Sequence, residues 1–231
     1  MVQEVRGFRE VREVQRVLVL AATLLESKLL QSAGANVVVT GIGAVNTAHA
    51  LTQHLAGRTT PSLVMQTGVA GAYVPADGPV GSVLLADTEI YGDLGVLTPH
   101  GWCPMEEIGI PLVEATLSNP ARFNYFPLDA GLVARAAAAA GDLIARTGKF
   151  LTVSQVTGVR AVGDVLYERF GALCESMEGA AAAHVCAMHG VPFLEVRGVS
   201  NLVEDRDRGK WRLVEAANAA QNAVMKILEN L

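Results

Sequence analysis

The chain has 231 residues, of which 51% are hydrophobic, and a formal net charge of −5. The lack of a basic excess gives nucleic-acid binding no electrostatic support. The longest apolar run, Val17 to Leu25, is far shorter than a membrane span, so we expect no membrane partner. Length and composition predict one compact domain over residues 1–231, in which residues 1–14 form a charged extension.

Predicted strands and helices alternate along the chain. Short β-branched or apolar runs predict strands, and longer stretches with an apolar stripe predict helices. The predicted strands are 14–22, 36–40, 62–66, 80–86, 89–91, 150–156 and 191–199. The predicted helices are 23–32, 45–55, 129–145, 164–170, 179–189 and 210–231. This alternation predicts an α/β fold with a largely parallel or mixed sheet.

Glycine-rich or polar turns follow several of these strands, where α/β proteins bind their ligands. They are 40–43, 67–71, 156–158, 176–179 and 200–201. The first contains Gly41-Ile42-Gly43, but Asn46 replaces the third glycine of a dinucleotide-binding motif and no acid ends the next predicted strand. We therefore expect no nicotinamide cofactor.

The irregular stretch from 92 to 127 interrupts the alternation. It contains five prolines and several aromatic residues, among them Phe123, Tyr125 and Phe126. Long irregular insertions in compact domains are usually functional or disordered, and the aromatic content argues against disorder. The sequence predicts either a wall of the ligand pocket or a contact between subunits, and leaves both open.

Cysteine and histidine spacing predicts neither a metal site nor a disulfide framework. The three cysteines are odd in number and lack metal-ligand spacing. His49 and His54 are five residues apart, which does not place them on one face of a helix. No signal-peptide pattern begins the chain. We expect reduced thiols in a cytoplasmic protein without a metal or organic cofactor.

Glu178 lies directly before an alanine-rich predicted helix, Gly179 to His189. A carboxylate held at such a junction has two acceptor oxygens and is suited to bind the vicinal hydroxyls of a ligand. The plainer explanation is that Glu178 only complements the positive end of its helix. The local pattern alone does not separate the two.

Five segments in order resemble those of the nucleoside phosphorylase/hydrolase superfamily. They are 22–26 (ATLLE), 40–46 (TGIGAVN), 67–71 (TGVAG), 176–181 (SMEGAA) and 197–201 (RGVSN). Each is a weak signal alone, and their common order and spacing make the resemblance specific. It covers nearly the whole chain from Val17 onward and implies a three-layer α/β fold, with a central mixed, partly barrel-like sheet flanked by helices.

The resemblance is greatest to the hydrolase branch, which includes methylthioadenosine/S-adenosylhomocysteine nucleosidases and futalosine hydrolases. The tail from Ser200 to Trp211 looks like that of futalosine hydrolases. The resemblance implies hydrolysis of the N-glycosidic bond of futalosine, a step of menaquinone biosynthesis that releases hypoxanthine and dehypoxanthine futalosine. The implied partner is a small purine nucleoside, and we also expect a homo-oligomer, a dimer or larger.

The resemblance also assigns roles to single residues. Glu26 matches the acid that activates the attacking water, and Asn201 matches the residue that faces the purine. Glu178 matches the ligand of the ribose hydroxyls, and Met177 the residue that packs on the ribose. The other positions implied in substrate binding are Ala70, Gly71, Val156, Thr157 and Ser200. This chemistry resembles glycoside hydrolysis, in which a carboxylate activates water and stabilises a sugar cation.

Two positions depart from the nucleosidase pattern. Asn201 replaces an aspartate, and a neutral amide donates to the acceptors N7 and O6 of a 6-oxopurine, which favours hypoxanthine over adenine. Val69 replaces a common serine and removes a polar group near the attacking water. Plainer explanations remain for three residues: Glu26 as a solvated acid, Met177 as core, and Asn201 as a turn former.

The resemblance leaves open a purine nucleosidase of the methylthioadenosine or aminofutalosine type, and two functions of other kinds also compete with the hydrolase. A nucleoside phosphorylase needs a cationic or amide-rich phosphate site, and the turns 41–43 and 67–71 contain no Arg or Lys. Arg197, inside the predicted strand 191–199, is the remaining candidate for a cationic phosphate site. A protein that only binds nucleosides is the other, but binding alone does not require a base such as Glu26.

Overall fold

The computed structural model describes residues 17–57, 60–117 and 119–231, so the 1–14 extension lies outside the described residues. The strands are β1 (Val17–Ala21), β2 (Val37–Val39), β3 (Leu63–Tyr73), β4 (Val83–Tyr91), β5 (Gly95–Thr98), β6 (Gly101–Pro104), β7 (Tyr125–Pro127), β8 (Arg146–Thr152), β9 (Cys174–Ser176) and β10 (Phe193–Val203). The helices are α2 (Lys28–Ser32), α3 (Ala44–Leu55), α4 (Met105–Ile108), α5 (Ala130–Ala140), α6 (Arg160–Phe170), α7 (Gly179–His189) and α8 (Leu213–Asn230). Among the described residues, no helix is long and apolar enough to span a membrane.

The central sheet is mixed and partly closed. Its strands follow the order β10-β4-β8-β9-β3-β1-β2, and β10 also pairs with β3, which closes β3, β9, β8, β4 and β10 into a ring. The β10–β3, β4–β8 and β8–β9 pairs are parallel, whereas β10–β4 and β3–β9 are antiparallel. The expected mixed, barrel-like sheet is confirmed.

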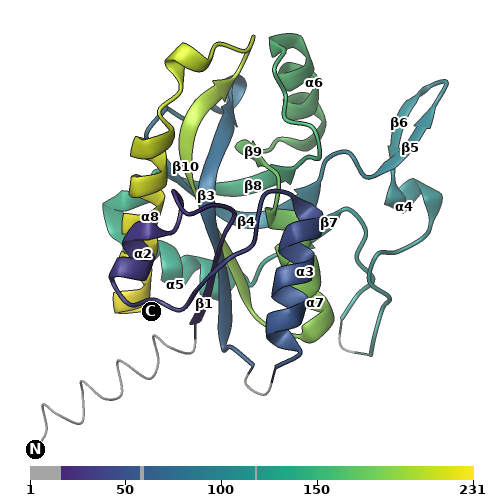
Figure 1. The fold of residues 1–231 in the computed structure, drawn as a ribbon. Helices are drawn as coiled ribbons and strands as arrows, with labels where there is room; N and C mark the ends of the chain where they lie inside the picture. The colour runs from purple at the N-terminus through teal and green to yellow at the C-terminus, as the bar shows by residue number, and fades with distance from the viewer. Residues whose placement is uncertain (1–16, 58–59, 118) are drawn as a thin grey trace, which may run out of the picture.

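Helices cover the sheet on two sides, with α3 and α7 together on one and α5 and α8 together on the other (Figure 1). Alternation along β1 accounts for this. Leu18 and Leu20 pack in the cluster that includes α3 and α7, whereas Val19 packs in the cluster that includes α5 and α8. Successive side chains of a strand point to opposite faces, so β1 contributes to two cores.

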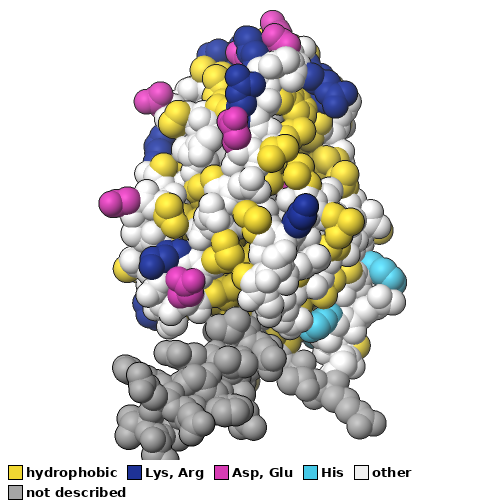
Figure 2. Space-filling view, turned by 60° about the vertical axis from the view of Figure 1, so that its left-hand side comes forward, with side chains coloured by type: hydrophobic (Ala, Val, Ile, Leu, Met, Phe, Trp, Pro, Cys, Tyr) yellow, Lys and Arg dark blue, Asp and Glu magenta, His cyan; other side chains and the backbone are white. Residues whose placement is uncertain are grey.

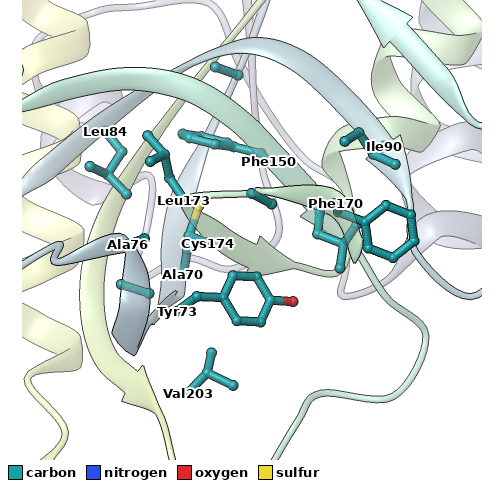
Figure 3. Packing of buried hydrophobic residues seen from close by; sticks show 14 of the residues in the cluster. Ala70, Tyr73, Ala76, Leu84, Ile90, Phe150, Phe170, Leu173, Cys174 and Val203 are labelled. Carbon is teal, nitrogen blue, oxygen red and sulfur yellow. The ribbon is translucent and has the colours of Figure 1, made fainter. Parts of the chain in front are cut away.

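A third core fills the closed part of the sheet. Tyr73, Phe150 and Cys174 lie in it, fully buried, and Phe170 from α6 joins them. Figure 3 shows the Tyr73 ring among the side chains of Ala70, Cys174 and Val203. This packing fixes β3, β8 and β9 relative to one another just where their ends carry polar residues.

The structure corrects several predicted boundaries. The predicted turn 67–71 continues strand β3, and the polar pair Ser200-Asn201 lies within β10. The two predicted strands 80–86 and 89–91 are the single strand β4. Glycine and alanine lower strand propensity in 67–71, but pairing with β10 and β9 on either side overrides it.

The predicted helix 23–32 begins only at Lys28, so Glu26 lies in the turn between β1 and α2. Two further segments near other strands also differ from their predictions. Residues 153–156, predicted as strand, follow the end of β8 at Thr152, and Cys174–Ser176, without a prediction, forms β9. Each difference affects a segment that borders the cavity described below.

The 92–127 insertion forms a hairpin, β5–β6, followed by α4, and these elements project from the body of the molecule (Figure 1). Asn124 connects the segments of this insertion close to the sheet. Its amide nitrogen donates to the carbonyls of Tyr91 (2.9 Å) and Leu94 (2.8 Å), and its amide oxygen accepts from the Met105 amide (2.8 Å). Strand β7 pairs with β4 and buries Phe126 at 1% exposure.

Candidate active site

A cavity of about 430 Å³ opens where β3, β9 and β10 meet the turn after β1. All nine residues that the sequence implied in catalysis or binding line it: Glu26, Ala70, Gly71, Val156, Thr157, Met177, Glu178, Ser200 and Asn201. These residues come from distant parts of the chain. Their roles stay predictions, but their common location is a property of the fold.

Glu26 is a buried acid on the wall of this cavity, not a solvated one. It is 5% exposed, and its Oε2 accepts from the Thr23 hydroxyl at 2.7 Å. Its Oε1 accepts from the main-chain amide of Val69 at 2.9 Å. Two donors from different segments fix the orientation of this carboxylate.

Strand β3 passes Glu26 so closely that Gly68 is required. A Cβ at Gly68 would lie 2.5 Å from both the Glu26 Oε1 and the Arg197 Nη1. Gly68 also has φ +157°, in the region that favours glycine. The TGVAG segment therefore allows main chain to approach the acid, and its Val69 amide becomes a donor to it.

Glu178 is held from outside its own helix. Its Oε1 accepts from the Gly43 amide at 2.9 Å, and its Oε2 pairs with Arg197 Nη2 at 3.1 Å. It is the N-cap residue of α7, but its side chain caps none of the helix amides. The helix-end explanation of this acid is therefore insufficient, and the Gly41-Ile42-Gly43 turn supplies a main-chain donor to it.

Arg197 is buried at 1% exposure and is surrounded by acceptors. Its Nε donates to Glu195 at 2.6 Å, and its Nη1 donates to the Val69 carbonyl at 3.1 Å. Burial alone would lower the pKa of Arg197, but the charges of Glu195, Glu178 and Glu26 outweigh it and raise the pKa. The guanidinium thus stays charged and compensates carboxylates that line the cavity.

A second pair of buried acids, which received no role from the sequence, lies behind this arginine. Glu89 on β4 and Glu195 on β10 are both 0% exposed. A Cβ at Gly179 would collide with an Oε2 atom of each, so the two carboxyl groups converge at the start of α7. Neither oxygen of Glu89 has a donor among the described residues. One proton shared between Glu89 and Glu195 would replace the repulsion of two carboxylates with a hydrogen bond.

This arrangement predicts a specific pH dependence of stability. Burial, and then the charge of Glu195, raise the pKa of Glu89 well above its ordinary value of 4.5. The folded state thus holds a proton that the unfolded chain releases, and stability is lost as pH rises from 4.5 through the raised pKa. Each tenfold change in proton affinity is worth about 1.4 kcal/mol, or roughly 3–6 °C in Tm for a chain of this size.

In Glu89→Gln the amide N–H replaces the carboxyl proton as a donor at every pH. We therefore expect the Tm of this variant to fall less than that of wild type between pH 5 and pH 9. Thermal unfolding across this range measures the difference, with Glu168→Gln as an exposed control on α6. Parallel curves for wild type and Glu89→Gln would show that Glu89 holds no extra proton in the folded state.

Asn201 is half-buried and already engaged by protein groups. Its Oδ1 accepts from the Ser200 hydroxyl at 2.8 Å, and its Nδ2 donates to the Leu202 carbonyl at 3.0 Å. One N–H remains for a ligand, so the prediction that this amide donates to both N7 and O6 is wrong for this conformation. Ser200 is buried and orients the amide of Asn201.

Met177 and Val156 present apolar surface to the cavity. Met177 is half-buried, which does not fit a plain core residue, and Val156 is 42% exposed. The rim also includes Arg206, whose guanidinium lies over the Trp211 ring at 4.7 Å. Neither Arg206 nor the buried Glu175 received a role from the sequence, although both flank segments of the family pattern.

The insertion does not wall this cavity within one chain. No described residue between 92 and 127 lines it, and Phe126 packs instead into the core between the sheet and α7. The prediction of a pocket wall is therefore wrong for the chain's own cavity, because pairing of β7 with β4 turns Phe126 inward. A contribution to the cavity of a neighbouring subunit stays a prediction.

Comparison with known proteins shows the family of this chain. A model of the phosphorylase superfamily matches residues 8–231. The futalosine hydrolase of Streptomyces coelicolor is 42% identical over 71% of this chain and 64% of its own length. The futalosine hydrolase of Thermus thermophilus is 37% identical over 86% of this chain and 83% of its own.

The fold is also that of a solved nucleosidase. The Neisseria meningitidis 5′-methylthioadenosine/S-adenosylhomocysteine nucleosidase, in complex with methylthio-immucillin-A, aligns with a TM-score of 0.76 at 22% identity, over 93% of this chain and 99% of that one. The chain belongs to the phosphorylase superfamily. Within that superfamily it is a member of the futalosine hydrolase family, as the match to the Thermus protein shows.

Proposed function

We propose that this protein hydrolyses the N-glycosidic bond of futalosine, releasing hypoxanthine and dehypoxanthine futalosine in menaquinone biosynthesis. The observation that carries the proposal is the pair of buried carboxylates on one cavity wall. Glu26 is held by Thr23 and Val69, and Glu178 by Gly43 and Arg197. Family relatives named futalosine hydrolase support the choice of nucleoside.

In the proposed reaction, Glu178 binds the ribose hydroxyls and Glu26 removes a proton from water. The bond to the purine lengthens, and the sugar develops the positive charge of an oxocarbenium ion. The nearby carboxylates stabilise that charge, while the free N–H of Asn201 stabilises the departing base. A base and a positioned donor each contribute roughly 10²–10⁴-fold to such reactions.

Water, and not phosphate, is the proposed nucleophile. Arg197 and Arg206 are the cationic side chains among the described residues of the cavity wall. Arg197 already donates to two carboxylates and a carbonyl, and Arg206 lies over Trp211 at the rim. Neither forms an open cationic site beside Glu26 of the kind that phosphate requires.

A second candidate is a nucleosidase that acts on 6-aminopurine compounds such as aminofutalosine or methylthioadenosine. The engaged Asn201 favours it in one respect, because one free N–H and a second lone pair on Oδ1 can also bond N7 and the 6-amino group of adenine. Rates with futalosine, aminofutalosine, methylthioadenosine and inosine decide between the two. The proposal requires futalosine to have the highest kcat/KM.

Asn201→Asp should shift preference from futalosine toward aminofutalosine. A carboxylate facing O6 places two acceptors together, and a mismatched polar group is strongly penalised. The measurement is the ratio of kcat/KM for futalosine to that for aminofutalosine in both proteins. A ratio unchanged within about twofold, or less than roughly 0.5 kcal/mol, would mean that Asn201 does not read the base.

We also propose that the protein is a cytoplasmic homo-oligomer. Figure 2 shows apolar side chains in a band across one face, with a few charged side chains among them. Large apolar side chains near the cavity are exposed, including Leu24 (68%), Ile42 (58%) and Val45 (83%). Exposed apolar surface of this kind favours contact with another subunit. Light scattering on the eluting protein measures its mass, and a monomer would contradict the proposal.

A further inference from the structure

Glu175, a third acid in the cavity wall, and Asn201 lie on opposite sides of Gly71. Gly71 on β3 pairs with Glu175 on β9 and with Asn201 on β10. Residues paired in this way lie on the same face of a sheet. The position of a Cβ on Gly71 would be 3.2 Å from Asn201 Nδ2 and 3.8 Å from Glu175 Cγ. The missing side chain of Gly71 therefore lets these two polar groups approach the same part of the cavity.

The carboxylate of Glu175 is fixed by two donors. Its Oε1 accepts from the Thr157 amide at 2.6 Å, and its Oε2 accepts from the Tyr73 hydroxyl at 2.9 Å. Tyr73 is 0% exposed in the core of the closed sheet, and this burial raises the pKa of its phenol, which keeps its proton. Each carboxylate oxygen retains a further lone pair for a ligand.

This contact changes which polar group the wall presents to the cavity near Val156. The amide of Thr157, next to the exposed Val156, is consumed by Glu175. An acceptor thus stands where the main chain would otherwise offer a donor. The N1 atom of adenine is an acceptor and would have matched a donor, whereas a 6-oxopurine carries a hydrogen on N1 and needs an acceptor when its edge is read.

We propose that Glu175 selects a 6-oxopurine by accepting a hydrogen bond from its N1–H, beside the contact made by Asn201. This inference rests on the proposed function, since it concerns the base of that substrate. The two residues then contact different atoms of the base. Asn201 has one N–H left for an acceptor, N7 or O6, and Glu175 accepts from the donor N1–H. An adenine in the same position would place its N1 lone pair against a carboxylate.

Glu175→Gln tests this selection. The amide oxygen still accepts from Thr157, and the amide nitrogen can donate both to the Tyr73 oxygen and into the cavity. We expect the ratio of kcat/KM for futalosine to that for aminofutalosine to fall about tenfold or more, because a site built around one polar pattern rejects the other. The exposed control Glu168→Gln should leave the ratio unchanged.

A purely structural Glu175, which only holds the Thr157 segment, would lower both rates equally, and equal losses would overturn the inference. Binding of free bases to wild type needs no variant. Hypoxanthine should bind at least about tenfold more tightly than either adenine or 1-methylhypoxanthine, which lacks the N1 hydrogen. Equal binding of hypoxanthine and 1-methylhypoxanthine would also overturn it. Failure of wild type to release hypoxanthine from futalosine would instead reject the proposed function, and base binding would still test Glu175.

Discussion

Glu26→Gln is expected to lower kcat for futalosine by about 10²–10⁴-fold while KM changes only a few-fold. The substitution removes the proton acceptor and keeps the shape of the side chain. Its amide oxygen still accepts from the Val69 amide, and its nitrogen can donate to the Thr23 hydroxyl. Binding is therefore retained, and the loss falls on the step in which water is deprotonated.

Steady-state kinetics of Glu26→Gln and of Glu168→Gln, an exposed acid on α6, measure this effect. The control should match wild type. Turnover of Glu26→Gln within about threefold of wild type would reject Glu26 as the base, and a loss confined to KM would assign it to binding alone.

Glu178→Gln is expected to weaken both binding and turnover. The neutral amide would lose charge-assisted hydrogen bonds to the ribose, each worth roughly 1.5–3 kcal/mol, or about 10–100-fold. Its nitrogen would also face either Gly43 N or Arg197 Nη2, both of which are donors. We expect kcat/KM to fall about 10²-fold or more, together with a lower Tm because buried Arg197 loses one of its two carboxylates.

The two substitutions differ in their kinetic signature. Glu178→Gln should raise KM and lower kcat, whereas Glu26→Gln should act on kcat. Isothermal titration with a non-hydrolysed nucleoside analogue separates the binding part directly. An unchanged affinity in Glu178→Gln would contradict a role at the ribose and leave this acid with only the pairing of Arg197.

The sequence was sufficient to predict the elements whose patterns are local. The alanine-rich helix 179–189 agrees with α7 at both ends, because Gly190 ends it with a φ of +65° and the residues before it are small and apolar. Helix 45–55 agrees with α3 within one residue. The residues predicted for the site line one cavity, since they lie in segments with recognisable order and spacing, and their roles stay predictions.

The sequence was insufficient where long-range pairing decides the structure. The turn predicted at 67–71 is a strand because β9 and β10 hydrogen-bond to it, and neither neighbour is close in sequence. The same pairing hid the place of Glu175 in the cavity wall, where it lies opposite Gly71. The Glu89–Glu195 contact joins β4 and β10 across the start of α7, and neither acid shows a local signal.

Release of hypoxanthine from futalosine in the presence and absence of phosphate distinguishes hydrolysis from phosphorolysis. Purified protein is incubated with futalosine in phosphate-free buffer, with and without added inorganic phosphate. The products are separated and identified by mass spectrometry. We expect equal rates in both buffers, with hypoxanthine and the free sugar, dehypoxanthine futalosine, as products. Release that requires phosphate, or a sugar 1-phosphate as product, would contradict the proposed hydrolysis.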